Sequence, residues 1–418
     1  MKAQEITDNI YCIHADIRTT ELFEGIWPIP DGVSLNAYLV RGQKTALIDL
    51  FCDWDKALGQ MEEAIASIDA NVDAGNAGAN KAYAGFSGID YLVLNHLEPD
   101  HTGWLREFRE KNPATEIIST QKGVNLVKSF YKIETGVRAV KDGDTLDLGG
   151  GKVLTFFEAP NVHWPETMVT WDASSGTLFS CDAFGSYGAL GEKVFDDQLD
   201  ETEHAFFEEE TLRYYSNIIS SFSPFVEKAI QKLSALEIKC IAPSHGIVWR
   251  GDPKKIIERY IKYASWAKGP AEKEIAVIWG SMYGNTFAGV EAVVRGIQKE
   301  GVPCTLHRVP DENISYIVAA AFRCSGLVIA MPTYEYAIFP PMAYALDIFR
   351  RKHIFGKKAL RIGSWGWVGG AKKEYDAVLE KLSWDCLDSF EWAGYPTGEE
   401  FAALEERGQE FARKVKNS

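Results

Sequence analysis

The sequence predicts an α/β protein of two domains, on three observations. The first part of the chain mixes short strands with helices, the last part alternates strands and helices regularly, and residues 266–270 (WAKGP) break the pattern between them. A chain of 418 residues that is 46% apolar and 12% aromatic can bury two or three cores. We therefore expect residues 1–268 and residues 269–418 to form separate domains.

Short apolar runs bounded by turn residues predict the strands of the first part, and helical periodicity predicts its helices. The expected strands are 9–13, 37–40, 45–50, 91–94, 116–119, 153–157, 167–171, 177–181 and 237–242, with helices near 55–68, 123–130, 206–221 and 225–235. This order indicates layered, mixed α/β structure. Residues 69–88 are rich in Ala, Gly and Asn without a period, which predicts an exposed loop or irregular insertion.

The last part alternates strands with helices. The expected strands are 275–279, 304–308, 326–330 and 358–364, and the expected helices are 286–300, 314–321, 342–349 and 374–382. Such alternation predicts a doubly wound parallel sheet whose ligand lies beyond the carboxyl ends of the strands.

Metal-ligating side chains gather at one strand end in the first part. His96, Glu98, Asp100 and His101 follow directly on the apolar run 91–94. Pro99 argues against a helix interior at this point. A strand that ends in this way delivers its donors to the edge of a sheet, where a rigid backbone can fix them around an ion.

Three later strands also end on a ligand, namely His163, Asp182 and His245. Each alone could be a capping or surface residue, but together the chain offers seven candidate ligands. Four imidazoles and three carboxylates without clustered thiolates form a harder donor set than a typical structural zinc site. Seven donors exceed what one first-row ion usually takes, and a carboxylate such as Asp182 can bridge two ions, so we expect a pair of metal ions.

Charge and cysteine usage exclude several classes of protein. The net charge of −15, almost all of it before Pro270, argues against a nucleic-acid partner. Seven single cysteines without a Cys-x-x-Cys predict reduced core residues and exclude a rubredoxin or a zinc ribbon. No leader-like segment opens the chain, and Arg323 interrupts the longest apolar run, so we expect a cytoplasmic protein without a membrane partner.

A second site is expected where the strand 275–278 runs through residues 280–286 (GSMYGNT) into a helix. Hydroxyls, an amide and a helix N-terminus converge there, which suits a phosphate monoester, although a plain Gly/Ser turn is the alternative. The Lys of a P-loop is missing, which disfavours nucleoside triphosphate hydrolysis.

Two further strand-end loops, 331–334 and 363–370, combine aromatic side chains with glycines. Aromatic faces beside open backbone amides can hold a planar heterocycle, and FMN has both such a ring and one phosphate. The candidate FMN-binding residues are Ser281, Met282, Tyr283, Gly284, Asn285, Thr286, Pro332, Thr333, Tyr334, Ser364, Trp365, Gly366, Trp367, Val368, Gly369 and Gly370.

The two halves, in this order, resemble a flavodiiron protein (A-type flavoprotein). The resemblance covers essentially the whole chain and rests on His-x-Glu-x-Asp-His at 96–101, HWPETM at 163–168 and SMYG at 281–284. Glu98 is its most specific element, because hydrolases of the same fold are expected to carry His there. The resemblance implies a metallo-β-lactamase-like αββα sandwich with a di-iron centre, followed by a flavodoxin-like domain with FMN.

By this resemblance His96, Glu98 and His163 hold one iron, Asp100, His101 and His245 hold the other, and Asp182 bridges them. For Trp367, a place between flavin and metal and a packing role are both open. The chain departs from the family pattern at Glu335, where Asn is common, at Trp365, where Tyr is common, and in the long 69–88 stretch. None of these departures touches a metal ligand.

The resemblance implies reduction of O2 to water, of NO to N2O, or of both, with electrons passing through FMN to two Fe. A rubredoxin, a flavin reductase or a deazaflavin would supply the electrons to a head-to-tail homodimer or a dimer of dimers. One alternative is a dinuclear zinc hydrolase with a flavodoxin-like appendage; another is a non-enzymatic electron carrier, which would leave seven ligands unused. The choice between O2 and NO is left open, and His14, His204, His307 and His353 are read as ordinary residues.

Overall fold

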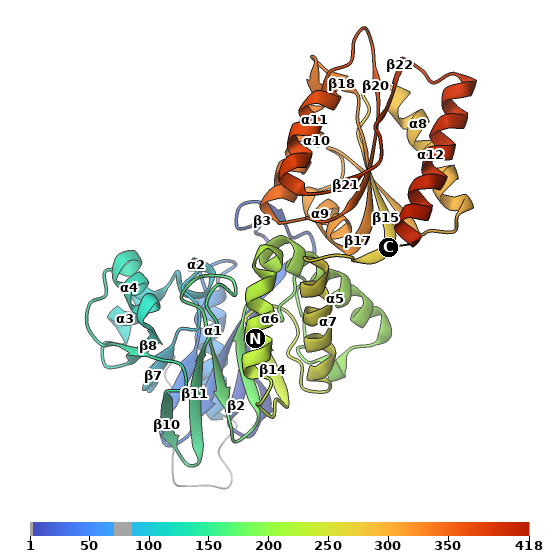
Figure 1. Ribbon diagram of the computed structural model, residues 1–418. Helices are drawn as coiled ribbons and strands as arrows, with labels where there is room; N and C mark the ends of the chain where they lie inside the picture. The colour runs from blue at the N-terminus through green and yellow to red at the C-terminus, as the bar shows by residue number, and fades with distance from the viewer. Residues whose placement is uncertain (1–2, 71–85, 418) are drawn as a thin grey trace. The chain divides into compact units, whose positions relative to one another are not determined.

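A computed structural model describes residues 3–70 and 86–417. The chain divides into two compact units, the first made of Met1–Tyr215 and Pro224–Ile261, the second of Ser216–Ser223 and Lys262–Ser418 (Figure 1). Most of the expected insertion at 69–88 lies outside the described residues.

Two sheets form the first unit. The seven-stranded sheet has the order β1-β2-β5-β6-β7-β8-β9, and the five-stranded sheet has the order β10-β11-β12-β13-β14. The strands are β1 (Gln4–Thr7), β2 (Ile10–Ile17), β5 (Val33–Arg41), β6 (Thr45–Ile48), β7 (Tyr91–Val93), β8 (Glu116–Thr120), β9 (Val137–Val140), β10 (Thr145–Gly149), β11 (Lys152–Glu158), β12 (Met168–Asp172), β13 (Thr177–Cys181) and β14 (Cys240–Pro243), with the small hairpin β3 (Leu22–Phe23) and β4 (Trp27–Pro28).

Helices flank these sheets. They are α1 (Ala57–Ala70), α2 (Pro99–Thr102), α3 (Leu105–Lys111), α4 (Gln121–Leu126), α5 (Glu201–Tyr214), α6 (Ser223–Leu233) and α7 (Pro253–Trp266). Figure 1 shows α3 and α4 on one side of the strands and α6 and α7 on the other. The αββα arrangement expected for this part of the chain is therefore confirmed.

Local backbone chemistry explains where the helices differ from expectation. Helix α1 begins at Ala57, because Asp55 and Lys56 adopt left-handed φ angles of 49° and 61°, which end a helix rather than continue it. Helix α5 begins five residues earlier than expected, because Asp200 and Glu203 form a capping box at its start. Helices α3 and α7 were not expected from the sequence.

One parallel sheet forms the centre of the second unit. Its order is β16-β15-β17-β20-β21, and β22 also pairs with β20. The strands are β15 (Glu272–Trp279), β16 (Cys304–Arg308), β17 (Cys324–Ala330), β20 (Lys358–Trp365), β21 (Asp385–Cys386) and β22 (Phe390–Ala393). All pairings along this sheet are parallel. The order is that of the doubly wound, flavodoxin-like fold, which confirms the expected class.

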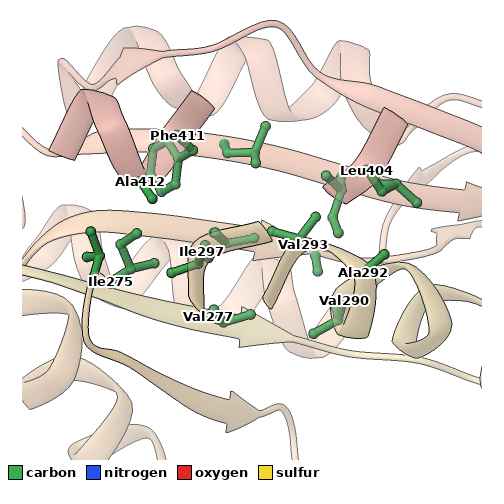
Figure 2. Close-up of a cluster of buried hydrophobic side chains, with 14 of the residues drawn as sticks. Ile275, Val277, Val290, Ala292, Val293, Ile297, Leu404, Phe411 and Ala412 are labelled. Carbon is green, nitrogen blue, oxygen red and sulfur yellow. The ribbon is translucent and has the colours of Figure 1, made fainter. Parts of the chain in front are cut away.

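Helices cover both faces of this sheet. They are α8 (Asn285–Lys299), α9 (Ile314–Arg323), α10 (Pro340–Arg351), α11 (Ala371–Leu382) and α12 (Gly398–Lys416). Ile275 and Val277 of β15 pack with Val293 of α8 and Phe411 of α12 in the cluster of Figure 2. Helix α12 was not expected, although Thr397 and Glu400 form a capping box that marks its start.

The cysteines and the apolar character of the helices also bear on the expectations from the sequence. All seven cysteines are free, and five of them are buried, as expected for reduced core residues. Across residues 3–70 and 86–417, no helix combines the length and the apolar character that crossing a bilayer requires.

A buried lysine lies just before β20. Only 2% of Lys357 is exposed, and its Nζ donates a 2.6 Å hydrogen bond to the carbonyl oxygen of Phe322. Burial lowers the pKa of Lys357 to about 7. Between pH 7 and 10.5 the amine is therefore neutral when folded and protonated when unfolded, so its cost to stability grows as the pH falls through this range.

We predict that Lys357→Met removes this pH dependence. The free energy of unfolding of the parent minus that of the variant should rise by up to about 1.4 kcal/mol per pH unit between about pH 7 and 10, because in this range the parent takes up one proton when it unfolds and the variant takes up none. Urea unfolding at a series of pH values measures this difference. A difference that does not change with pH would contradict a neutral buried amine.

Candidate metal centre and flavin pocket

The seven candidate ligands are placed by strand ends and by one short helix. His96 and Glu98 follow β7, and Asp100 and His101 lie in α2, which begins at Pro99. Pro suits the first position of a helix, because its missing N–H would have no partner there. His163 follows β11, Asp182 comes directly after β13, and His245 comes two residues after β14.

The fold brings all seven side chains together. His96, Glu98, His163 and Asp182 offer ligand atoms within 4.8 Å of one another, and Asp100, His101 and His245 form a second such group. All are buried except Glu98, which is half-buried. The other four histidines, His14, His204, His307 and His353, belong to neither group.

The Asp182 carboxylate lies between the two groups. Its Oδ1 is 2.9 Å from His101 Nε2 and 3.6 Å from His245 Nε2. Its Oδ2 is 3.0 Å from His163 Nε2 and 3.7 Å from His96 Nε2. Each oxygen therefore faces a different group, which is the arrangement of a carboxylate that can bridge two ions.

The carboxylates and imidazoles of the site shift one another's pKa values. Burial raises the pKa of Glu98, but hydrogen bonds from His163 and His96 outweigh burial and lower it to about 2. Burial likewise lowers the pKa of His101, but the charges of Asp100 and Asp182 outweigh it and raise the value to about 9. The carboxylates thus hold their charge inside the protein and attract positive charge.

Unsatisfied atoms show that this donor set fits metal ions. Both carboxylate oxygens of Asp100, and Nε2 of His245, are buried without a hydrogen-bond partner in the described part of the chain. They are nevertheless close, since Asp100 Oδ2 is 3.2 Å from His245 Nε2. Buried polar atoms that converge without bonding one another are typical of ligands that need an ion.

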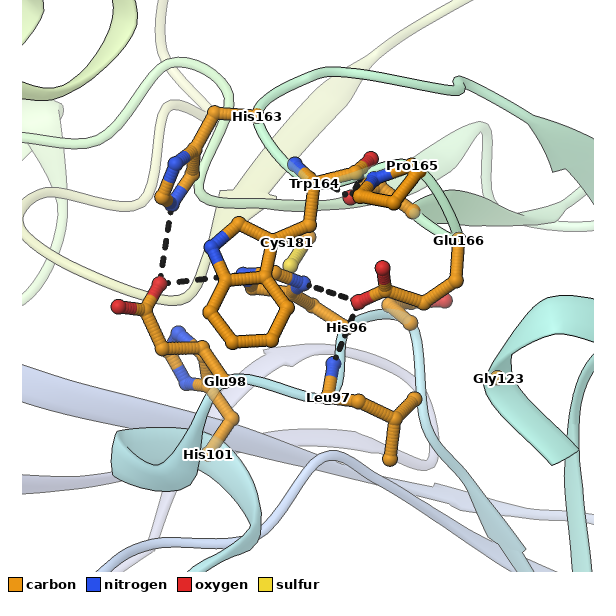
Figure 3. Close-up of polar contacts among 12 residues, drawn as sticks. His96, Leu97, Glu98, His101, Gly123, His163, Trp164, Pro165, Glu166 and Cys181 are labelled. Atoms are coloured by element: carbon orange, nitrogen blue, oxygen red, sulfur yellow. Dashed lines mark hydrogen bonds and ion pairs between the residues drawn. The ribbon is translucent and has the colours of Figure 1, made fainter. Parts of the chain in front are cut away.

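A second layer of hydrogen bonds orients the ligands. Glu166 Oε1 accepts hydrogen bonds from His96 Nδ1 at 2.8 Å and from the Leu97 N–H at 3.0 Å (Figure 3). His245 Nδ1 is 2.8 Å from the Ser34 carbonyl oxygen, which turns Nε2 toward the site. Glu166 lies in the HWPETM motif at 163–168, but the sequence alone does not indicate its orienting role.

Aromatic side chains pack against the second group. The ring centroids of Phe23 and Tyr214 lie 5.3 Å and 5.8 Å from that of His245. Tyr187 packs on Tyr214 with the centroids 5.1 Å apart. The three rings are buried and exclude water from this side of the site. They were not expected from the sequence, because they come from a hairpin, a loop and a helix far apart in the chain.

A separate pocket of about 330 Å³ lies in the second unit, at the carboxyl ends of β15, β17 and β20. It is lined by Ser281, Met282, Tyr283, Asn285, Thr286, Pro332, Thr333, Tyr334, Glu335, Tyr336, Ser364, Trp365, Gly366, Trp367 and Val368. The three expected loops therefore meet at one pocket. Its volume is in the range of small-molecule sites.

Two features of this pocket fit a phosphorylated ring. Helix α8 begins at Asn285, and its N-cap residue Gly284 provides no side-chain cap, which leaves N–H groups of the first turn for an anion. Thr333 Oγ1 is a buried hydroxyl that has no hydrogen-bond partner among the described residues. Thr286 Oγ1 and Ser364 Oγ lie 2.8 Å apart and connect the first loop to the third.

Some expected residues lie at the margin of this pocket. Gly284, Gly369 and Gly370 do not line it, and the last two border a neighbouring hollow beside α11. Glu335 and Tyr336 line it although only the preceding loop residues were expected to do so. Trp367 is 77% exposed, and its ring contacts Tyr336 edge-on at the rim of the pocket.

One family model matches part of the first unit, and known proteins resemble the chain over almost its whole length. The family described as ODP family beta lactamase matches residues 78–246. An anaerobic nitric oxide reductase flavorubredoxin from Vibrio vulnificus (strain YJ016) is 33% identical over 98% of this chain and 79% of its own length. The rubredoxin oxygen:oxidoreductase from Desulfovibrio gigas has a TM-score of 0.89 at 27% identity, covering 100% of this chain and 99% of that one.

A flavo di-iron protein from Thermotoga maritima gives a TM-score of 0.84 at 27% identity, covering 99% of this chain and 98% of that one. Similarity at this level extends through both units, with a metallo-β-lactamase-like domain followed by a flavodoxin-like domain. The chain belongs to the flavodiiron protein family, and it is an oxidoreductase.

We predict that Glu166→Gln weakens metal binding about 10–100-fold, because the amide loses the charge that orients His96 and strengthens it as a donor. Competition with a chromophoric chelator measures the affinity for Fe²⁺ or Zn²⁺. Glu158→Gln, on β11 and outside both ligand groups, is the matched control and should bind as the parent does. Parent-like affinity in Glu166→Gln would contradict the orienting role.

Proposed function

We propose that this protein reduces O2 to water, NO to N2O, or both, with electrons that pass through FMN to a pair of irons. The observation that carries the proposal is the Asp182 carboxylate, whose two oxygens face two separate groups of imidazole and carboxylate ligands. The named activities of the relatives support it, since one is a nitric oxide reductase and another an oxygen oxidoreductase.

The residues divide naturally between two ions. His96, Glu98 and His163 would hold one iron, and Asp100, His101 and His245 would hold the other, with Asp182 shared. Glu98 supports iron over the zinc of a hydrolase, because a carboxylate makes the donor set harder than a third imidazole would. The alternative function is a dinuclear zinc hydrolase. Every observation that fits a zinc hydrolase also fits a di-iron site.

When bound, two ferrous ions and one reduced FMN would supply four electrons, which matches the reaction O2 + 4e⁻ + 4H⁺ → 2H2O. The coupling 2NO + 2e⁻ + 2H⁺ → N2O + H2O needs half as many. Tyr187 and Tyr214, which pack on the His245 side of the site, stay neutral. Their hydroxyls are buried without a hydrogen-bond partner in the described chain, and burial raises the pKa of both well above its usual value, so each keeps its proton.

In the second unit, the loops after β15, β17 and β20 would hold FMN. The uncapped start of α8, with the Ser281 and Thr286 hydroxyls nearby, suits the phosphate. Tyr334 and Trp365 present aromatic faces for the ring, and Thr333 Oγ1 offers it an unused hydrogen bond. Gly369 and Gly370 follow the third of these loops and border the neighbouring hollow.

The assembly and its partners complete the proposal. By family resemblance a head-to-tail homodimer, or a dimer of two such dimers, would set one subunit's FMN beside the other subunit's irons. A rubredoxin or a flavin reductase would donate the electrons, and the name of the Desulfovibrio gigas relative supports the rubredoxin. We place the protein in the cytoplasm, without a membrane or nucleic-acid partner.

Metal and flavin analysis, followed by gas reduction, tests the function. We predict two irons and one FMN per chain, and uptake of one O2 without release of peroxide, or formation of two N2O, per fully reduced chain. Asp182→Asn should lose iron and gas reduction but keep FMN, because its amide does not bridge two cations as an anion does. Zinc in place of iron would indicate the hydrolase, and no metal would indicate an electron carrier.

A further inference from the structure

A two-residue turn lines the candidate flavin pocket. Strands β18 (Thr333–Tyr334) and β19 (Ala337–Ile338) form a hairpin, and Glu335 and Tyr336 join them. Both joining residues have left-handed φ angles, 45° and 65°. Positive φ at both central positions is the pattern of a type I′ turn, which favours Asn-Gly because larger side chains are strained there.

The surrounding structure holds this unfavourable turn in place. The Ile338 N–H donates a 2.7 Å hydrogen bond to Glu374 Oε2 of α11. Tyr336 packs edge-on against Trp367 of the third loop, with the centroids 6.4 Å apart. Position 370 accepts only Gly, because a Cβ would collide with the Tyr336 carbonyl oxygen. Strained residues that a fold maintains in this way mark functional positions.

The turn brings a negative charge to the pocket, while Lys372, Lys373 and Asp376 of the adjoining helix α11 border the neighbouring hollow. Glu335 is the one carboxylate among the side chains described as lining it, and its titratable companions there are the phenols Tyr283, Tyr334 and Tyr336. Behind the loops, Glu374 is bonded to the hairpin backbone, and Arg361 pairs with Glu391 at 2.7 Å. No cation among the described residues forms an ion pair with Glu335.

We propose that the Glu335 carboxylate keeps the reduced flavin neutral and so couples the uptake of a second proton to its reduction. This inference rests on the proposed function, since it requires FMN in this pocket. With the second proton the reaction is FMN + 2e⁻ + 2H⁺ → FMNH2; without it the product is the anion FMNH⁻. A nearby carboxylate repels the anion and leaves the neutral forms unaffected. One unit charge in a partly solvated pocket changes such an equilibrium by roughly tenfold.

The reduction potential of bound FMN, measured against pH, tests this coupling. The metal-free protein with FMN bound is reduced stepwise by dithionite with mediators and followed by absorbance. Each proton taken up changes the equilibrium constant tenfold per pH unit, which is about 30 mV for two electrons. The potential should therefore fall by about 60 mV per pH unit at low pH, and by about 30 mV per unit once the anion forms.

In Glu335→Gln the pH at which the slope changes from about 60 to about 30 mV per unit should be about one unit lower than in the parent. Above that pH the potential should be about 30 mV higher than in the parent, which corresponds to a tenfold change in the equilibrium constant. Glu335→Asp keeps the charge, and Asp tolerates left-handed φ, so it should restore the parent behaviour. Glu380→Gln removes an exposed carboxylate of α11 outside the pocket and should behave as the parent does.

Four results would overturn the coupling. They are an unchanged slope and potential in Glu335→Gln, a Glu335→Asp variant that follows Glu335→Gln, an equal shift in Glu380→Gln, and a shift of opposite sign. Each of these leaves the proposed function intact, because FMN is bound in every sample. A parent protein that does not bind FMN would instead refute the proposed function, and with it this inference.

Discussion

The position of one carboxylate, Asp182, determines what the first unit can do. A buried charge is stable only with partners, and Asp182 has partners on both sides, with imidazoles of one group near Oδ1 and of the other near Oδ2. It lies at the end of β13, where a rigid strand holds it between the loops that carry the other six candidate ligands. Removing it would leave two half-sites instead of one dinuclear centre.

The second unit follows the rule for open parallel sheets. Strand order reverses between β15 and β17, and the pocket lies beyond the carboxyl ends of these strands and of β20. Loops supply the specific contacts, while the core of β15, α8 and α12 supplies rigidity. Glu335 and Tyr336 adopt φ angles that are unfavourable for their residue types, although the surrounding sheet and helices are regular. A strained turn within a regular fold points to a functional role for that turn.

Much of the fold and the metal site follows from local sequence signals. His96, Glu98, Asp100 and His101 stand beside one apolar run, so their common strand end was visible. The role of Glu166 was harder to predict. It bonds to His96 Nδ1, the ring nitrogen that faces away from the metal site, and such carboxylates occur at no fixed distance along the sequence from the ligand. Phe23, Tyr187 and Tyr214 reach His245 through tertiary packing alone, which no local pattern encodes. Helix α12, by contrast, carried a readable capping box that was overlooked.

Anomalous diffraction from crystals of the protein purified with iron would locate the metal ions around Asp182. Data collected at the iron and zinc absorption edges should give two iron peaks per chain about 3.5–4 Å apart, one on each side of the Asp182 carboxylate. A single peak, zinc at both positions, or iron bound away from His96 and His245 would contradict a di-iron centre held by these seven residues.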